Sequence, residues 1–327
     1  MRRSRTPRQA ACRRLAALAC AALACAAFPS VAVAAPALAE PAPDWSVQEL
    51  VVTAGPAPVM WRLSRGESEV WVLGVLPIMP KDQAWNSKPL ERVIAGSRVV
   101  LTPPVATAGL GSAFQVLTQH GLPHGQTLDA QLTPELKARL DRGRAMAHVS
   151  PTAYAHDKPI WATLMLWTAY TRAARLSGAE PNATLVRLAR AHHVPVRPVA
   201  SYKAGAMVTN FLHLTPQEGE ACLGDILADI GAAEADARPA AQAWAKGDLK
   251  AVRAHYAEPS VRLCLEQAPS WRALADRSVE DVEKALNAAL ATPGKSVAIF
   301  PLGELLRRGG ALDRLRAEGV KVETPGM

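Results

Sequence analysis

Histidine is the residue type best suited to bind a metal ion, and all eight histidines of this sequence lie beyond position 39. His120 and His124, in the segment "HGLPH", have the i, i+4 spacing of a helical metal pair. Gly121 and Pro123 disfavour a helix there, so the pair does not share a helix face. A structural or solvent-facing role is also the preferred interpretation of the others, which are His148, His156, His192, His193, His213 and His255.

The sequence lacks the usual pattern of a serine nucleophile, because no Gly-x-Ser-x-Gly elbow is present. Two cysteines follow position 39, Cys222 in "EACLGDIL" and Cys264 in "VRLCLEQA". In an oxidising compartment an even pair favours one disulfide between two helices, which would constrain the unfolded chain by roughly 3–4 kcal/mol. The alternative is two buried free thiols.

Strands are expected at both ends of the chain. Residues 58–77 contain two apolar runs around the turn-prone "SRGES", which predicts a hairpin. "NSKPLERVIAGS", residues 86–97, predicts a helix, and "SRVVLTPP", residues 97–104, predicts a strand that Pro103 and Pro104 stop. Residues 295–323 repeat the order strand, helix, strand.

The middle of the chain is predicted to be mainly helical. Thr133 should N-cap a helix beginning at Pro134, and residues 158–178 predict a long buried helix. A short strand is expected at 194–200, and the remaining helices at 181–193, 215–236, 241–257 and 270–294. These elements predict a single α/β (α+β) domain over residues 58–327, with a central mixed sheet built from the terminal strands and a helical insertion at about 107–292.

Two apolar strands break into Gly/Pro loops, "VWVLGVLP" at 70–77 and "VAIFPLGE" at 297–304. If these strands are neighbours, both loops meet at one edge of the sheet. That edge is where α/β proteins usually place their site.

Residues 297–323, "VAIFPLGELLRRGGALDRLRAEGVKVE", resemble the closing motif of the TraB/PrgY/GumN family, which is related to the Tiki proteases. "WVLGVLP" resembles the first motif of that family, a strand such as "VYLLGTIH" that ends in Gly-x-x-His. "AWAKGDLKAV" is similar to its Trp-x-x-Gly-Asp helix and "LADRSVEDVEKAL" to its Arg-Asn helix. The resemblance runs from about 61 to 323, in the family's order and spacing.

The resemblance implies a metal-dependent hydrolase in which two motif histidines and an acid hold a divalent cation such as Zn²⁺, Mn²⁺ or Co²⁺. In this chain Pro77 and Glu304 stand at the histidine positions, and Thr102 stands at the acid position. One carboxylate without partners does not hold such an ion tightly. The vestigial site that the resemblance implies comprises Gly74, Pro77, Thr102, Arg277, Pro301 and Glu304.

The sequence therefore predicts a non-catalytic binding protein, a pseudoenzyme without cofactor or metal, whose inherited cleft takes a peptide, a glycan or an envelope protein. The alternative is a rewired or metal-dependent hydrolase that uses Glu304, Arg277 and one histidine. Convergence of Pro77, Thr102, Arg277 and Glu304 on an apolar pocket would favour binding, whereas histidines entering that pocket would favour the enzyme.

The first 39 residues have the pattern of a secretory signal peptide, with an arginine-rich start, an apolar run of 14 residues and small-residue cleavage sites after Ala34 and Ala39. The run is shorter than the ~20 residues that a permanent membrane span needs. We therefore expect a periplasmic or secreted protein that begins with a flexible Pro/Ala linker at 40–57.

Charge gives no reason to expect nucleic acid as a partner. Six of the 37 basic residues and none of the 29 acidic residues lie in 1–39, so the net charge of +8 falls to +2 after cleavage. Later basic residues such as Arg307 and Arg308 are interpreted as part of a solvated face.

Overall fold

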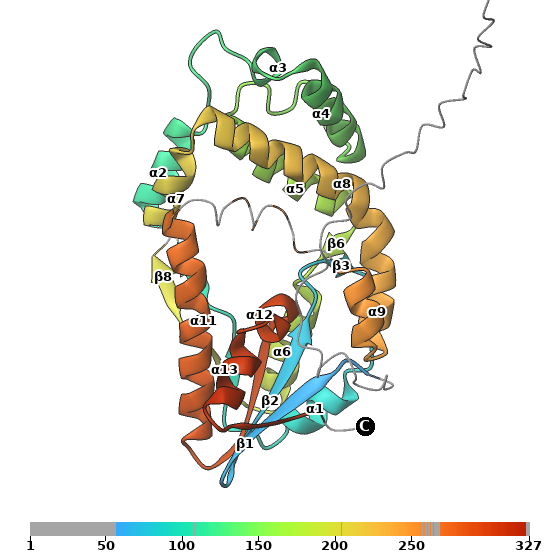
Figure 1. The fold of residues 1–327 in the computed structure, drawn as a ribbon, viewed down its shortest axis with the longest axis vertical. Coiled ribbons are helices and arrows are strands. Elements are labelled where there is room, and N and C mark those ends of the chain that lie inside the picture. Colours follow the sequence, from blue (N-terminus) through green and yellow to red (C-terminus); the bar gives the residue numbers. More distant parts are fainter. Residues whose placement is uncertain are drawn as a thin grey trace, which may run out of the picture. The chain divides into compact units, whose positions relative to one another are not determined.

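The computed structural model describes residues 57–107, 109–203, 205–256, 258, 260, 262, 264 and 269–324. The predicted signal peptide and nearly all of the predicted linker lie outside these residues. The order of the described elements is shown in Figure 1.

A six-stranded mixed sheet has the strand order β10-β1-β2-β9-β4-β7. Strands β1 (Met60–Arg65) and β2 (Ser68–Val75) form the predicted antiparallel hairpin, with Gly66 in the turn at φ +58°. Strands β9 (Gly294–Pro301), β4 (Val100–Thr102) and β7 (Val196–Pro198) continue the sheet in parallel, and β10 (Lys321–Glu323) pairs antiparallel with β1. The prediction of a central mixed sheet from both ends of the chain is confirmed.

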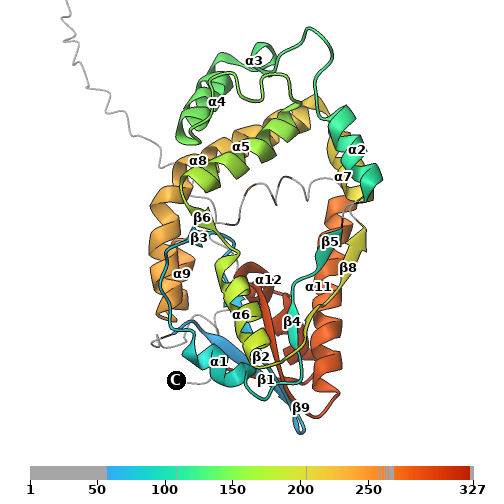
Figure 2. The ribbon, with the colours of Figure 1, turned by 180° about the vertical axis from the view of Figure 1, so that it is seen from behind.

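Helices cover both faces of this sheet because the crossovers run in opposite directions along it. From β2 the chain moves outward through α1 (Lys88–Ile94) to β4 and then through α6 (Glu180–Ala191) to β7. From β9 it returns the other way through α12 (Leu302–Leu306) and α13 (Ala311–Ala317) to β10. Right-handed crossovers of opposite direction place their helices on opposite faces. Figures 1 and 2 show α13 with α11 (Pro269–Leu290) on one face and α1 with α6 on the other.

The inserted segment forms a second hydrophobic core. Helix α8 (Pro216–Ala245) packs along α5 (Pro159–Ala173) and α4 (Pro134–Met146), and α9 (Leu249–Ala254) packs on α8. Gly143 lets α4 approach closely, because a Cβ there would lie 2.7 Å from Leu227 Cδ2. The smaller elements are α2 (Leu110–Gln119) against α7 (Gly205–Leu212), α3 (Leu128–Gln131), and the two-stranded pairs β3 (Met79–Pro80) with β6 (Leu176–Ser177) and β5 (Val105–Thr107) with β8 (Ser201–Lys203).

Helix α8 differs from the prediction of two helices with a break between them. It runs unbroken for 30 residues from Thr215, whose side chain forms a capping box with Glu218, and it contains Pro239. Its first part contributes Leu223 to the core of the insertion, and its last turns contribute Trp244 to the core of the sheet. Burial in both cores stabilises a continuous helix despite the backbone hydrogen bond that Pro239 cannot donate.

Two further predictions concern single helices. The side chain of Thr133 accepts a hydrogen bond from Leu136 N, as expected of the N-cap of α4. The sequence predicted a long buried helix here, and α5 is only partly buried. Ile160, Leu166 and Tyr170 are buried, whereas Trp161, Leu164, Met165 and Trp167 are half-buried and Thr168 is exposed.

Candidate functional site

The two Gly/Pro loops begin side by side at the same edge of the sheet, because the condition that the sequence left open, adjacency of their strands, is met. Strands β2 and β9 are adjacent and parallel, and their register pairs Gly74 with Phe300 and Val75 with Pro301. The strand ends that resemble the first and the closing motif therefore meet. Pro301 then caps the short helix α12, which carries Glu304.

Gly74 is required by packing. A Cβ at this position would touch the side chain of Leu302 and lie 2.8 Å from Trp61 Cζ3. The carbonyl oxygen of Gly74 accepts a 2.8 Å hydrogen bond from Trp244 Nε1, and Trp85 packs edge-on against Trp244 with ring centroids 5.3 Å apart. The glycine of the first motif and the tryptophan of "AWAKGD" are thus partners in the fold.

Pro77 lines a small cavity of about 50 Å³ together with its neighbours Leu76 and Ile78. The acidic residues Asp229 and Asp236 from α8 and the side chain of His255 also line this cavity, and His255 Nδ1 lies 3.2 Å from Asp236 Oδ1. Asp229 accepts hydrogen bonds of 2.7 Å from both the backbone N–H and the hydroxyl of Ser260. At about 50 Å³ the cavity has room for a few water molecules but not for a ligand of substrate size.

Glu304 lines a separate and much larger cavity, of about 600 Å³. Pro103 and Pro104, which end β4, form part of its wall, and so do Tyr202 on β8 and Asp276 on α11. Thr102 is not among the lining residues. It is buried, and its carbonyl oxygen accepts a hydrogen bond from Val199 N.

Arg277 lies outside the wall of this cavity, with its side chain 68% exposed. Its Nε is 3.6 Å from Asp281 Oδ2, and its guanidinium carbon lies 5.5 Å from the centre of the Tyr202 ring. The Tyr202 hydroxyl donates a 2.8 Å hydrogen bond to Asp281 Oδ2. Burial and the hydrogen bond to Asp281 raise the pKa of Tyr202 to about 12. Arg277 therefore helps to hold Tyr202, which does line the cavity.

A chain of three polar side chains joins the two cavities. The Tyr256 hydroxyl donates to Glu258 Oε2 at 3.0 Å, and Arg262 Nε donates to Glu258 Oε1 at 2.6 Å. Tyr256 and Glu258 line the small cavity, whereas Arg262 lines the large one. A Cβ on Gly303 would lie 2.5 Å from Glu258 Oε2 and 2.6 Å from the Tyr256 hydroxyl oxygen. The side chains of Tyr256 and Glu258 therefore pack directly on the closing motif.

The local sequence does not predict this arrangement. The i, i+4 spacing of Glu258 and Arg262 was the available signal, but nothing local indicates that Glu258 packs on Gly303. Burial, followed by the nearby Glu258 carboxylate, raises the pKa of the Tyr256 phenol well above its usual range. Tyr256 therefore remains a neutral hydrogen-bond donor at physiological pH.

The four positions Pro77, Thr102, Arg277 and Glu304 do not converge on one pocket, because only Glu304 lines the large cavity. The convergence that would have favoured binding at the inherited site is therefore not found. No histidine is among the residues that line it. Within the described ranges, no group of three or more His, Cys, Asp or Glu side chains is arranged to hold a metal ion. His120 and His124 are not on a helix, as predicted, and His120 Nδ1 lies 2.8 Å from Asp157 Oδ1.

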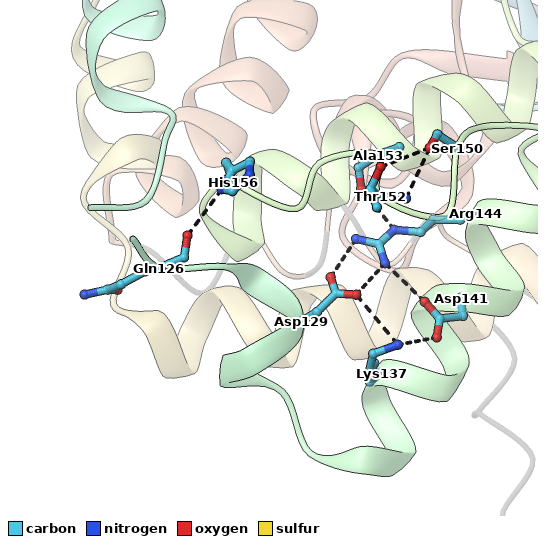
Figure 3. Close-up of polar contacts among 9 residues, drawn as sticks. All are labelled: Gln126, Asp129, Lys137, Asp141, Arg144, Ser150, Thr152, Ala153 and His156. Atoms are coloured by element: carbon cyan, nitrogen blue, oxygen red, sulfur yellow. Dashed lines mark hydrogen bonds and ion pairs between the residues drawn. The ribbon is translucent and has the colours of Figure 1, made fainter. Parts of the chain in front are cut away.

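A second cluster of charges lies in the inserted segment around Arg144, whose side chain is 1% exposed (Figure 3). Its guanidinium donates two hydrogen bonds to Asp129, at 2.8 and 2.9 Å, one to Asp141 at 3.1 Å and one to the Ala153 carbonyl at 3.0 Å. The hydrogen bonds from Arg144 hold the pKa of Asp129 below its ordinary value of 3.8. The cluster ties α3 to α4 and to the following turn, which is a structural role.

The predicted disulfide between Cys222 and Cys264 is present, with Cα atoms 5.5 Å apart. It connects the first part of α8 to the segment that carries Glu258 and Arg262. Ile160 and Phe211 belong to the same buried apolar cluster. The disulfide therefore constrains the segment that covers the closing motif.

The fold and the paired strand ends define a class of protein: the chain belongs to the TraB/PrgY/gumN family, whose model matches residues 59–324. That match covers nearly all of the described chain and confirms the resemblance found in the sequence. No curated protein and no solved structure matches the chain significantly. Within the described ranges, no helix has both the length and the hydrophobicity needed to cross a membrane.

Proposed function

We propose that this chain is an exported, non-catalytic member of the TraB/PrgY/gumN family that binds a peptide, a glycan or an envelope protein in the large cavity. One observation carries the proposal: the cavity at the carboxyl edge of the sheet is large, yet among Pro77, Thr102 and Glu304 only Glu304 reaches it. One carboxylate neither holds a transition metal tightly nor lowers the pKa of a bound water.

The size and the walls of the cavity support binding. About 600 Å³ lies within the usual range for small-ligand sites, roughly 300–1,000 Å³. Pro103, Pro104 and Leu274 supply apolar surface, and charged side chains lie among them. A few sugar units or a short peptide segment would fill such a space.

The hydrolase alternative has less support. It requires Glu304 beside Arg277 and a histidine, but Arg277 pairs with Asp281 outside the cavity wall. His255, which lies beside Asp236, lines the small cavity and is not among the residues that line the large one. A general base would thus lack its partners.

Export is supported by two features. Residues 1–39 have the pattern of a secretory signal, and the disulfide between Cys222 and Cys264 is typical of proteins in oxidising compartments. Finding the mature protein in the periplasmic or secreted fraction, with its N-terminus at residue 35 or 40, tests this part of the proposal.

The decisive experiment is metal stoichiometry by mass spectrometry on the mature protein without a histidine tag, after equilibration with Zn²⁺, Mn²⁺ and Co²⁺. We expect occupancy near zero, equal in the wild type, in Glu304→Gln and in the control Glu135→Gln, whose side chain is exposed on α4. Close to one ion per chain that is lost only in Glu304→Gln would overturn the proposal.

A further inference from the structure

We infer that the large cavity recognises its ligand through an oxyanion, either a carboxylate or a phosphate, attached to a body with an apolar or ring surface. This inference rests on the proposed binding function and names the chemistry of its ligand. No motif marks such a site in the sequence.

Arginines dominate the charged lining of the cavity. The lining contains Arg262, Arg272, Arg307, Arg308 and Arg314, but only two carboxylates, Asp276 and Glu304. Arg262 pairs with Glu258, and Arg314 lies 3.4 Å from Glu283, both outside this lining. Among the lining residues that the structure describes, guanidinium groups thus outnumber carboxylates, and a guanidinium that already has one acidic partner keeps further N–H donors for a bound anion.

The arginines reach the cavity from three separate parts of the chain. Arg262 comes from the segment after α9, Arg272 from α11, and Arg307 and Arg308 from the loop between α12 and α13. Arg307 and Arg308 are exposed, in agreement with the solvated face expected from the sequence, and the tertiary structure also makes them part of the cavity lining. Side chains from distant segments that share one concave surface can surround a ligand, which neighbours on one helix cannot do.

Guanidinium groups suit this ligand chemistry because their planar N–H donors match the two oxygens of a carboxylate or phosphate. Apart from Asp276, Ser278 and Glu304, the remaining wall is apolar or aromatic. Pro103, Pro104 and Val279 contribute non-polar surface, and the Tyr202 hydroxyl is engaged by Asp281, so the ring is the part of Tyr202 best placed to contact a ligand. The cavity thus combines anion recognition with a surface for an apolar or ring-shaped body.

The test is isothermal titration calorimetry of the mature protein with two probes, inorganic phosphate and a triglutamate peptide. Arg307→Gln is the test variant, because Arg307 is exposed and its replacement should leave the fold intact. Arg187→Gln, an exposed arginine on α6 outside the cavity lining, is the matched control. Thermal melting of all three proteins checks that they are folded.

We expect at least one probe to bind the wild type, binding to weaken roughly 10-fold in Arg307→Gln with no change in Arg187→Gln, and binding to weaken as salt is added. The preferred probe then shows whether phosphate or carboxylate is the natural group. No binding of either probe at millimolar concentration, or equal binding by wild type and Arg307→Gln, would overturn the inference.

Metal occupancy measured on the same preparation separates the two proposals. If neither probe binds and no metal ion is held, only the inferred ligand chemistry is overturned, and the proposed non-catalytic function stands. A tightly held ion overturns the non-catalytic function itself.

Discussion

The indole Nε1 of Trp244 donates a 2.8 Å hydrogen bond to the carbonyl oxygen of Gly74, and Trp244 is 1% exposed. This bond connects the end of α8 to the end of β2, across 170 residues of sequence. It fixes the helical insertion to the strand end from which the first Gly/Pro loop begins. The bond thus helps to position the candidate site without touching either cavity.

Trp244→Phe should lower the free energy of unfolding by about 1–3 kcal/mol, because it removes a buried hydrogen bond while keeping an aromatic ring. Chemical denaturation measures the change. Trp161→Phe is the control, because Trp161 is only half-buried and should cost less. Equal losses in the two variants would show that the bond to Gly74 contributes little.

Gly74→Ala should destabilise the protein by about 1–3 kcal/mol through overpacking against Leu302 and Trp61. Gly231→Ala on α8 is the matched control, because a Cβ there meets no atom within 4 Å. That control should be neutral or stabilise the helix by up to about 1 kcal/mol. If the midpoint denaturant concentration of Gly74→Ala equals that of the wild type, the prediction that close packing excludes a side chain at Gly74 is refuted.

Arg144→Met should lower the free energy of unfolding at neutral pH by about 3 kcal/mol, since it removes the buried partner of Asp129 and Asp141 and leaves only the more exposed Lys137 beside them. The loss should fall at the low end of the usual range because the Asp129 side chain is 25% exposed. The pKa of Asp129 is lowered in the folded state, so its contribution is present above the ordinary value of 3.8 and disappears as pH falls further.

The difference between wild type and Arg144→Met should therefore shrink below about pH 3.8. Denaturation curves from neutral to acid pH test this expectation. A difference that stays constant over that range would contradict it.

Replacing both cysteines by serine, or reducing the disulfide, should lower the free energy of unfolding by roughly 3–4 kcal/mol, because Cys222 and Cys264 are 42 residues apart. Reduced and oxidised wild type compared by denaturation provide the measurement. The double serine variant with and without reductant is the control and should show no difference.

Tyr202 should make stability fall at alkaline pH. Its pKa rises from 10.0 to about 12 on folding, so the folded state favours the neutral phenol. That contribution is complete below pH 10 and is lost as the pH rises towards 12. Tyr202→Phe should show a shallower decline over this range, and tyrosinate absorbance should lose its late-titrating component. An unchanged titration curve would refute the assignment.

Several parts of the fold follow from local sequence alone. Alternating and continuous apolar runs predicted the β1–β2 hairpin and β9, and Pro134 with Thr133 marked the start of α4. The continuity of α8 through Pro239 was not predictable, because local rules assign a break there. Only burial at both of its ends, by Leu223 and by Trp244, stabilises the unbroken helix.

For the site, the sequence by itself determined that two apolar strands end in Gly/Pro loops, and its resemblance to the family placed Pro77, Thr102 and Glu304 at the positions expected of metal ligands. The tertiary structure decided that these two strands are neighbours. The tertiary structure alone decided that Pro77 and Glu304 line different cavities, that Arg277 holds Tyr202 from outside, and that Glu258 packs on Gly303. It also gathered Arg262, Arg272, Arg307, Arg308 and Arg314 around one cavity. The physical reason is that side-chain type is local information, whereas the direction and neighbours of a side chain depend on contacts between segments far apart in the chain.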